Sequence, residues 1–215
     1  DTIDLTRHAV DLGVHQALVL PPFYLKPVTD EGLTRSFSEI IEGVSSDVLA
    51  ITAYHFPRLS GVPIPTVVLN RLGHSYGPVI SGVKDSTGDP ASLTTFLDAC
   101  PELDIFPGSE TLLLTGLRRG SSGVITAGAN VNPRMLRAIY DNPETADALQ
   151  DRATAIRSEI QAHGTVPATK ALLAHFHEDE GWLGMRAPLT QSQLPDGKAL
   201  ASAIGALGYE WPQLP

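Results

Sequence analysis

The chain has 215 residues and a formal net charge of −9 at pH 7, with 42% hydrophobic and 18% charged residues. This length can bury a sizeable core, as one large or two small domains. The acidic balance argues against nucleic acid and anionic membranes as partners, and no apolar run approaches the roughly 20 residues that span a bilayer. The single cysteine, Cys100, cannot form an internal disulfide, which favours a cytoplasmic location.

Apolar runs recur along the first two thirds of the chain and alternate with helical periods. Continuous apolar runs of this kind are typical of strands that are buried on both faces. The runs occupy residues 14–23, 46–57, 77–85, 102–110 and 121–130, and helical periods cover 29–44, 89–100 and 109–120. This alternation predicts α/β architecture with parallel strands and right-handed crossovers.

Residues suited to capping mark the starts of the predicted helices. Thr29 stands before an acidic first turn, and Asp89 precedes Pro90, a residue that suits the first helical position. Ser109 can cap the third helix, and Gly120 can end it.

After residue 131 the pattern is helical only. Helical spacing covers residues 132–141, 143–164, 167–181 and 190–208. The first of these helices belongs to the last β/α unit, and the others exceed what a barrel needs. We therefore expect a partial (β/α) barrel over residues 1–142 and a C-terminal helical domain over residues 143–215.

Polar residues gather just after the predicted strands, as they do at the catalytic rim of a (β/α)8 barrel. They are Tyr24, Tyr54, Lys84, Ser109 and Asn130. Only about five strands are predicted instead of eight, and an amphipathic helix over residues 1–13 comes before the first. The sequence is typical of a (β/α)8 TIM barrel that begins at its third helix, so we expect an N-terminally incomplete barrel.

The stretch VISGVKDSTGD, residues 79–89, places Lys84 at the end of an apolar run. A lysine at a strand end can reach water by extending its stem along apolar surface. Alternatively it lies inside a pocket, where an amine held away from water acts as a nucleophile. The pattern alone leaves both interpretations open.

Several segments in one order and at one spacing resemble the dihydrodipicolinate synthase / N-acetylneuraminate lyase family. They are LVLPPFYLKPVTDEGL (18–33), YHFPRLSGV (54–62), GVKDSTGD (82–89), FPGSE (106–110) and GVITAGANVNP (123–133). The resemblance implies a (β/α)8 barrel with a C-terminal helical domain, assembled as a dimer or tetramer. It also implies a class I, Schiff-base lyase that acts on pyruvate or another 2-oxo acid.

The resemblance also implies roles for individual residues. Lys84 matches the family's Schiff-base lysine, Tyr54 its proton-shuttling tyrosine, and Tyr24 the second aromatic of a proton relay, while Phe23 lacks the hydroxyl of the first. Gly108 matches a glycine beside the substrate pocket, and Ile125 matches a substrate-binding position where the strand backbone approaches the tyrosine. Each has a plainer alternative: a core tyrosine for Tyr54, a strand-end aromatic for Tyr24, a turn glycine for Gly108 and barrel core for Ile125.

Two departures from the family pattern concern substrate binding. The family's first three strands, with a carboxylate-binding loop, would precede Asp1, so we expect either a piece of a longer enzyme or an incomplete half-barrel. Leu59 stands where dihydrodipicolinate synthases carry an arginine, and Arg58 comes one place earlier. This favours a sugar-acid or other 2-oxo acid aldolase; the alternative is a 2-oxo-3-deoxy sugar-acid dehydratase that uses the same imine.

The histidines do not form a pattern typical of metal ligands. His175 and His177 lie two apart and so do not share a helix face. His55 follows Tyr54 and points the other way along its strand. We expect no metal and no cofactor.

Overall fold

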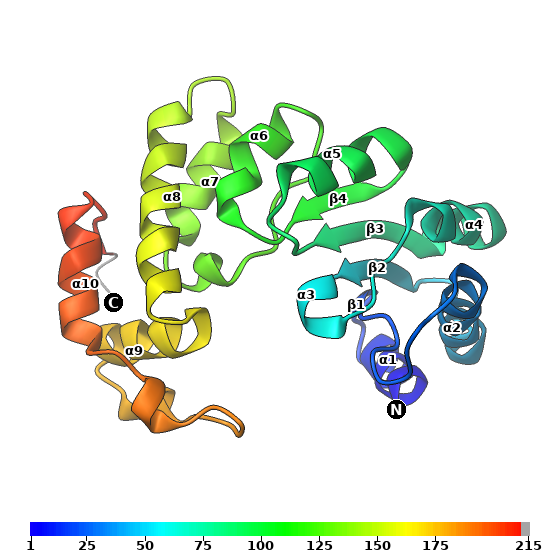
Figure 1. Ribbon diagram of the computed structural model, residues 1–215, viewed down its shortest axis with the longest axis horizontal. Coiled ribbons are helices and arrows are strands. Elements are labelled where there is room, and N and C mark those ends of the chain that lie inside the picture. The colour runs from blue at the N-terminus through cyan, green and yellow to red at the C-terminus, as the bar shows by residue number, and fades with distance from the viewer. Residues whose placement is uncertain (212–215) are drawn as a thin grey trace. The chain divides into compact units, whose positions relative to one another are not determined.

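The computed structural model describes residues 1–211, which group by their contacts into two units (Figure 1). The first unit contains Asp1–Gly108 and Arg119–Gly123, and the second contains Ser109–Arg118 and the described part of Val124–Pro215. This grouping differs from the division expected after residue 142, because the segment from Val124 and the helix that follows it group with the C-terminal helices. The last residues of the expected C-terminal domain, 212–215, lie outside the described part.

The first unit is built on a parallel four-stranded sheet of order β1-β2-β3-β4. Its strands are β1 (Gln16–Val19), β2 (Ala50–His55), β3 (Ile80–Asp85) and β4 (Asp104–Pro107). Its helices are α1 (Thr2–Asp11), α2 (Asp30–Val44), the short α3 (Pro57–Ser60), α4 (Thr66–Tyr76), the 3₁₀ turn η1 (Gly77–Val79) and α5 (Pro90–Ala99). Strand order therefore follows chain order, as in successive β/α units of a barrel.

The predicted caps of two helices are confirmed. The Thr29 side chain accepts a hydrogen bond from the Gly32 N–H at the start of α2. The Asp89 carboxylate accepts from the Ala91 N–H at the start of α5, where Pro90 occupies the first turn. The helix α4 had no counterpart among the predicted elements; its opening residues, Thr66–Val68, are β-branched and favour strands when read alone.

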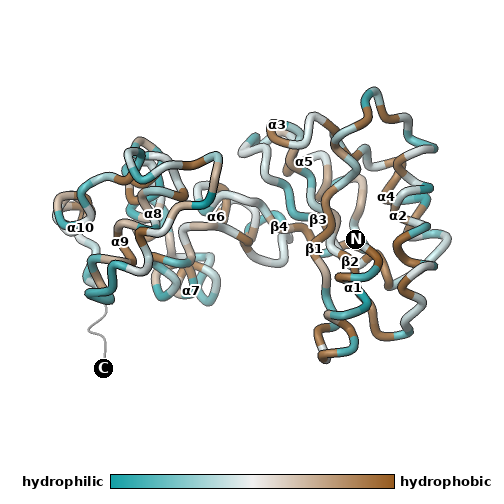
Figure 2. Tube along the Cα trace, turned by 90° about the horizontal axis from the view of Figure 1, so that it is seen from below, coloured by the Kyte–Doolittle hydropathy of each residue, from teal (hydrophilic) through white to brown (hydrophobic). Residues whose placement is uncertain are grey.

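One face of the sheet forms the core of the first unit with α2, α4 and α5. Figures 1 and 2 both show α2 and α4 side by side along the sheet, and Figure 2 shows hydrophobic colouring where the chain passes through the strands. Each strand directs one residue of the same ladder level to this face, and all four are buried: Val19, Ala53, Val83 and Ile105. Phe37, Leu69 and Leu72 pack beneath them from the helices, and each is at most 1% exposed.

The expectation that every strand is buried on both faces is wrong for β1. Leu18 is 43% exposed, and Leu20, directly after the strand, is 44% exposed. Within the described residues β1 lies at an edge of the sheet, where it pairs only with β2. An edge strand lacks the second neighbour that would cover such side chains.

The predicted fifth strand, over 121–130, is also wrong: residues 121–126 have no regular structure, and Ala127–Asn130 form the 3₁₀ turn η3. The Ser122 N–H donates to the Ile105 carbonyl of β4 at 3.0 Å, so the chain does approach the sheet. Gly123 then adopts φ +144°, a conformation that favours glycine and takes the chain out of the ladder.

The second unit is helical, as predicted for the C-terminal part of the chain. Its elements are η2 (Glu110–Leu112), α6 (Leu113–Leu117), η3, α7 (Pro133–Asp141), α8 (Asp147–Ala162), α9 (Thr165–His177), η4 (Glu180–Leu183), η5 (Gln191–Gln193) and α10 (Gly197–Ala206). Their apolar faces share one core, which includes Ile139, Ile156, Ile160, Leu172 and Ile204. None of the helices in residues 1–211 combines the length and apolar character needed to cross a bilayer.

Replacing Leu69 by alanine should lower the free energy of unfolding by about 2–5 kcal/mol, because the side chain is fully buried and a cavity would remain. Val67→Ala on the same helix, where the side chain is 41% exposed, should cost less than about 1 kcal/mol. Urea unfolding followed by circular dichroism measures both. Equal losses in the two variants would contradict the described orientation of α4.

Candidate active site at the carboxyl ends of the strands

The pairing register brings Tyr54, Lys84 and Phe106 to one level across three strands. Tyr54 of β2 is the ladder partner of Lys84 of β3, which in turn pairs with Phe106 of β4. Residues at one level of a parallel ladder point to the same face of the sheet. All three are half-buried, in contrast to the fully buried residues one place earlier on the opposite face.

Lys84 directs its amine toward the Tyr54 ring. The Nζ atom lies 4.2 Å from the ring centroid, a distance at which the π-face attracts a cation. The structure therefore brings together the two residues that the family pattern marks for the central chemistry. The Lys84 side chain is half-buried at the strand end.

A second aromatic–cation pair continues this arrangement. The Phe56 ring stacks on Tyr54 with centroids 5.8 Å apart and an interplanar angle of 26°. The Arg58 guanidinium carbon lies 5.7 Å from the Phe56 centroid. Two cations thus lie over two stacked rings at the end of β2, which favours an anionic ligand there. Sequence reasoning missed Phe56, although its aromatic character two residues after Tyr54 placed it on the same face.

Tyr24 stands apart from this group. It lies in the loop between β1 and α2, and its side chain is 88% exposed. The same loop is attached to the end of α3, because the Lys26 ammonium donates to the Ser60 carbonyl at 3.2 Å. The structure of this chain does not pack Tyr24 against Lys84 or Tyr54.

Gly108 lies where the loops after β3 and β4 meet. Its N–H donates to the Asp85 carbonyl at 2.6 Å, and a Cβ built on it would lie 2.1 Å from the Ser86 hydroxyl oxygen and 2.9 Å from the Ser86 Cα. Only glycine fits this approach, and the position is next to the end of the lysine-bearing strand. Ile125 belongs to the second unit, in the segment between Gly123 and η3, and is 36% exposed.

The opposite face of the same strand ends carries a buried His55–Asp85 pair. The two residues are ladder partners, and they are 7% and 1% exposed. The Ile64 N–H donates to His55 Nδ1 at 3.0 Å, which identifies that nitrogen as unprotonated. Burial lowers the pKa of His55 below its ordinary value of 6.5, and the Asp85 carboxylate offsets part of this effect.

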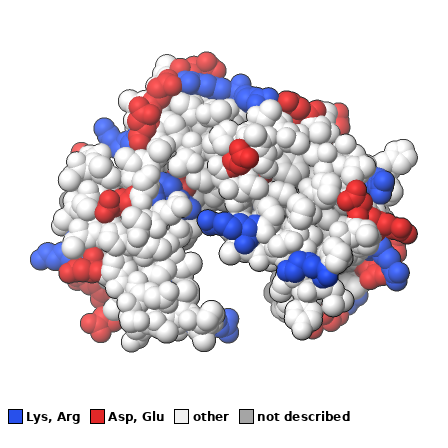
Figure 3. Space-filling view, viewed as in Figure 1, with Lys and Arg blue, Asp and Glu red and all other residues white. Residues whose placement is uncertain are grey.

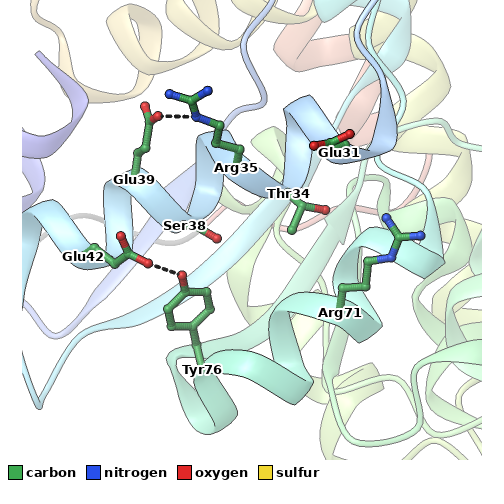
Figure 4. Close-up of a pocket in the computed structure, with 8 residues that line it drawn as sticks. All are labelled: Glu31, Thr34, Arg35, Ser38, Glu39, Glu42, Arg71 and Tyr76. Carbon is green, nitrogen blue, oxygen red and sulfur yellow. Dashed lines mark hydrogen bonds and ion pairs between the residues drawn. The ribbon is translucent and has the colours of Figure 1, made fainter.

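The surface groove between α2 and α4 offers a different set of side chains (Figure 4). Glu31, Glu39 and Glu42 line it together with Arg35 and Arg71. Figure 3 shows acidic and basic side chains next to one another over these helices. The Tyr76 hydroxyl donates to Glu42 at 2.5 Å, and this bond raises the pKa of Tyr76. Arg35 pairs with Glu39 along α2, and residues 1–211 contain no cluster of His, Cys, Asp and Glu suited to a metal ion.

The sequence matches the model of the dihydrodipicolinate synthetase family over residues 1–206. The protein belongs to this family. A DapA-like lyase of Chloroflexus aurantiacus is 35% identical over 206 residues, which cover 94% of this chain and 68% of the relative. A 4-hydroxy-tetrahydrodipicolinate synthase of Halorhodospira halophila is 31% identical over 200 residues, covering 89% of this chain and 63% of the relative.

A solved structure shows the same fold. Dihydrodipicolinate synthase from Agrobacterium tumefaciens is 28% identical and superposes with a TM-score of 0.84, covering 95% of this chain and 70% of that structure. The predicted fold class, part of a (β/α)8 barrel with additional C-terminal helices, is confirmed with four strands instead of five. The chain spans about two thirds of the length of these relatives, and the three named here are a lyase and two synthases.

The buried imidazole predicts a pH dependence of stability. Because the pKa of His55 is lower in the folded state, the unfolded chain binds the extra proton as the pH falls through 6.5. The free energy of unfolding is therefore higher above this pH and decreases as the pH falls below it. In His55→Asn the amide oxygen still accepts from the Ile64 N–H but does not titrate.

Urea unfolding between pH 7.5 and about pH 5.5 tests this prediction. The wild type should lose stability more steeply than His55→Asn as the pH falls. Parallel pH profiles for the two proteins would contradict it.

Proposed function

We propose that the protein is a Schiff-base class I lyase acting on pyruvate or a related 2-oxo acid, with Lys84 as the nucleophile. The observation that carries the proposal is the shared ladder position of Tyr54 and Lys84, with the Lys84 Nζ 4.2 Å from the Tyr54 ring centroid. Membership of a family whose named relatives include lyases supports it.

The proposed reaction begins when the unprotonated Lys84 amine attacks the ketone carbon of the 2-oxo acid. The carbonyl oxygen leaves as water, and a protonated imine forms. The imine draws electrons from the neighbouring carbon, which then releases a proton or breaks its bond to an aldehyde carbon. Tyr54 takes up and returns the proton at these steps, as a general acid and base of this kind can.

The cations over the Tyr54 and Phe56 rings would bind the substrate's anionic group. Arg58 lies over Phe56 just after β2, and the Phe56 ring stacks on Tyr54. Leu59, the neighbour that replaces the arginine of dihydrodipicolinate synthases, is 74% exposed and offers no charge. This arrangement favours a sugar-acid or other 2-oxo acid as the substrate over an amino-acid semialdehyde.

A dehydratase of 2-oxo-3-deoxy sugar acids is the second candidate, because the same Lys84 imine would activate the carbon that loses its proton. Aldol cleavage releases pyruvate from the substrate, whereas dehydration does not. Assembly as a dimer or tetramer and a cytoplasmic location stay predictions. So do Tyr24 as a relay group and Gly108 and Ile125 as pocket residues.

Incubation with pyruvate and borohydride should attach a reduced adduct to Lys84, because hydride reduces the imine to a stable amine. The expected mass increase is that of pyruvate, less one water and plus two hydrogens. Intact mass and peptide mapping measure the adduct and its position. Lys84→Arg should give none, because a guanidinium does not deprotonate to attack a ketone, whereas Lys26→Arg should react like the wild type. Folded wild-type protein without an adduct would contradict the proposal.

Tyr54→Phe should slow proton transfer by about a hundredfold or more, because it removes the hydroxyl and keeps the ring beneath the Lys84 amine. Exchange of the pyruvate methyl protons for deuterium, followed by NMR in heavy water, measures this step without a second substrate. Tyr76→Phe, on the outer surface of α4, is the matched control. Equal exchange rates in wild type and Tyr54→Phe would assign the proton transfer to another group.

A further inference from the structure

Asp85 carries a buried carboxylate and directly follows Lys84 at the end of β3. Side chains alternate along a strand, so the carboxylate lies on the core face of the sheet and the Lys84 amine on the other. Removing a carboxylate from water costs several kcal/mol, a cost that a well-packed apolar residue would avoid. The hydrogen bonds of Asp85 therefore indicate what a carboxylate does at this position.

The carboxylate bonds to one residue of the loop that follows β3. Asp85 Oδ1 accepts from the Thr87 N–H at 3.0 Å and from the Thr87 hydroxyl at 2.8 Å. The second oxygen, Oδ2, is buried and has no hydrogen-bond partner within residues 1–211. The side-chain bonds of Asp85 thus fix both the backbone and the hydroxyl of Thr87.

Similar bonds continue from Thr87 to helix α5. The Thr87 hydroxyl accepts from the Asp89 N–H at 3.2 Å, and the Asp89 carboxylate accepts from the Ala91 N–H at 2.9 Å. Each of these side chains therefore holds the backbone of the residue two places further along the chain. Together they connect the end of β3 to the first turn of α5.

Backbone hydrogen bonds hold the end of β3 on both sides. The Ser86 N–H donates to the His55 carbonyl of β2 at 2.8 Å, and the Asp85 carbonyl accepts from the Gly108 N–H, just after β4, at 2.6 Å. All of these residues belong to the first unit. The backbone next to Lys84 is thus fixed by the neighbouring strand ends and, through Asp85 and Thr87, by its own loop.

We propose that Asp85 is a positioning residue that holds the backbone of Lys84 for attack on the substrate's ketone. A lysine carries its amine on a flexible four-carbon stem, so the direction of attack depends on how firmly its backbone is held. A misplacement of about 1 Å between reacting groups can slow a reaction about a hundredfold. Because the carboxylate and the amine lie on opposite faces of the sheet, Asp85 acts through the backbone. This inference rests on the proposed function of Lys84.

Thr87→Val tests the proposal, because it removes the hydroxyl that donates to Asp85 and keeps the β-branched shape of a half-buried side chain. The maximal rate of borohydride trapping at saturating pyruvate should fall about tenfold. The pyruvate concentration that half-saturates trapping should stay within about twofold, since Arg58 is unchanged. Thr87→Ser keeps the hydroxyl and should trap at the wild-type rate. Thr95→Val is the matched control, since that exposed hydroxyl donates to the Ala91 carbonyl of its own helix.

Hydrogen–deuterium exchange read by mass spectrometry provides a test that does not depend on activity. In Thr87→Val, exchange should rise in peptides that contain residues 84–91 and stay unchanged over α2 and α4. Unchanged exchange over 84–91, or a rise spread over the whole first unit, would overturn the positioning role.

The trapping result decides whether this role serves Lys84. An unchanged maximal rate in Thr87→Val, or a loss that Thr87→Ser does not restore, would overturn the connection to the amine. A wild type that fails to trap pyruvate overturns the proposed function, while the exchange result still decides whether Asp85 and Thr87 fix the end of β3.

Discussion

The parallel pairing of β2 with β3 is the constraint on which the candidate site depends. Side chains alternate along each strand, so one register assigns Ala53 and Val83 to the core and Tyr54 and Lys84 to the other face. A slip of one residue would bury the lysine and expose the valine. The apolar core therefore fixes the position of the proposed chemistry, because the register that buries it also sets the amine over the ring.

Close approach between neighbouring strand ends adds a second, steric constraint. A Cβ on Gly82 would lie 2.4 Å from the Asp104 carbonyl oxygen, and Gly108 fits against Ser86 with equally little room. Two glycines thus let β3 and its following loop approach β4. On the opposite face His55 and Asp85 end the same strands as a buried polar pair. The site therefore lies on a part of the sheet where side-chain size and charge are both restricted.

The sequence predicted the elements that rest on local patterns. Four apolar runs form strands, and the caps at Thr29 and Asp89 are present, because each depends on neighbouring residues only. The predicted strand at 121–130 is wrong because a strand needs continued ladder bonds, and the backbone turns away at Gly123. The burial of Glu110, which is 0% exposed, had no local signal: its partners Gln150 and Arg157 are far away in the chain. The family pattern assigned Lys84 and Tyr54 to one reaction. The contacts of Phe56 with Tyr54 and with Arg58 required the structure.

The placement of Lys84 over an aromatic face suits the proposed imine chemistry for an electrostatic reason. A protonated imine carries one positive charge at the lysine nitrogen, and a π-face attracts such a charge. The Tyr54 ring would therefore stabilise the proposed intermediate. Arg58 over Phe56 repeats this arrangement just beyond the strand end. An aliphatic residue in place of either ring would remove the π-face that attracts the nearby cation.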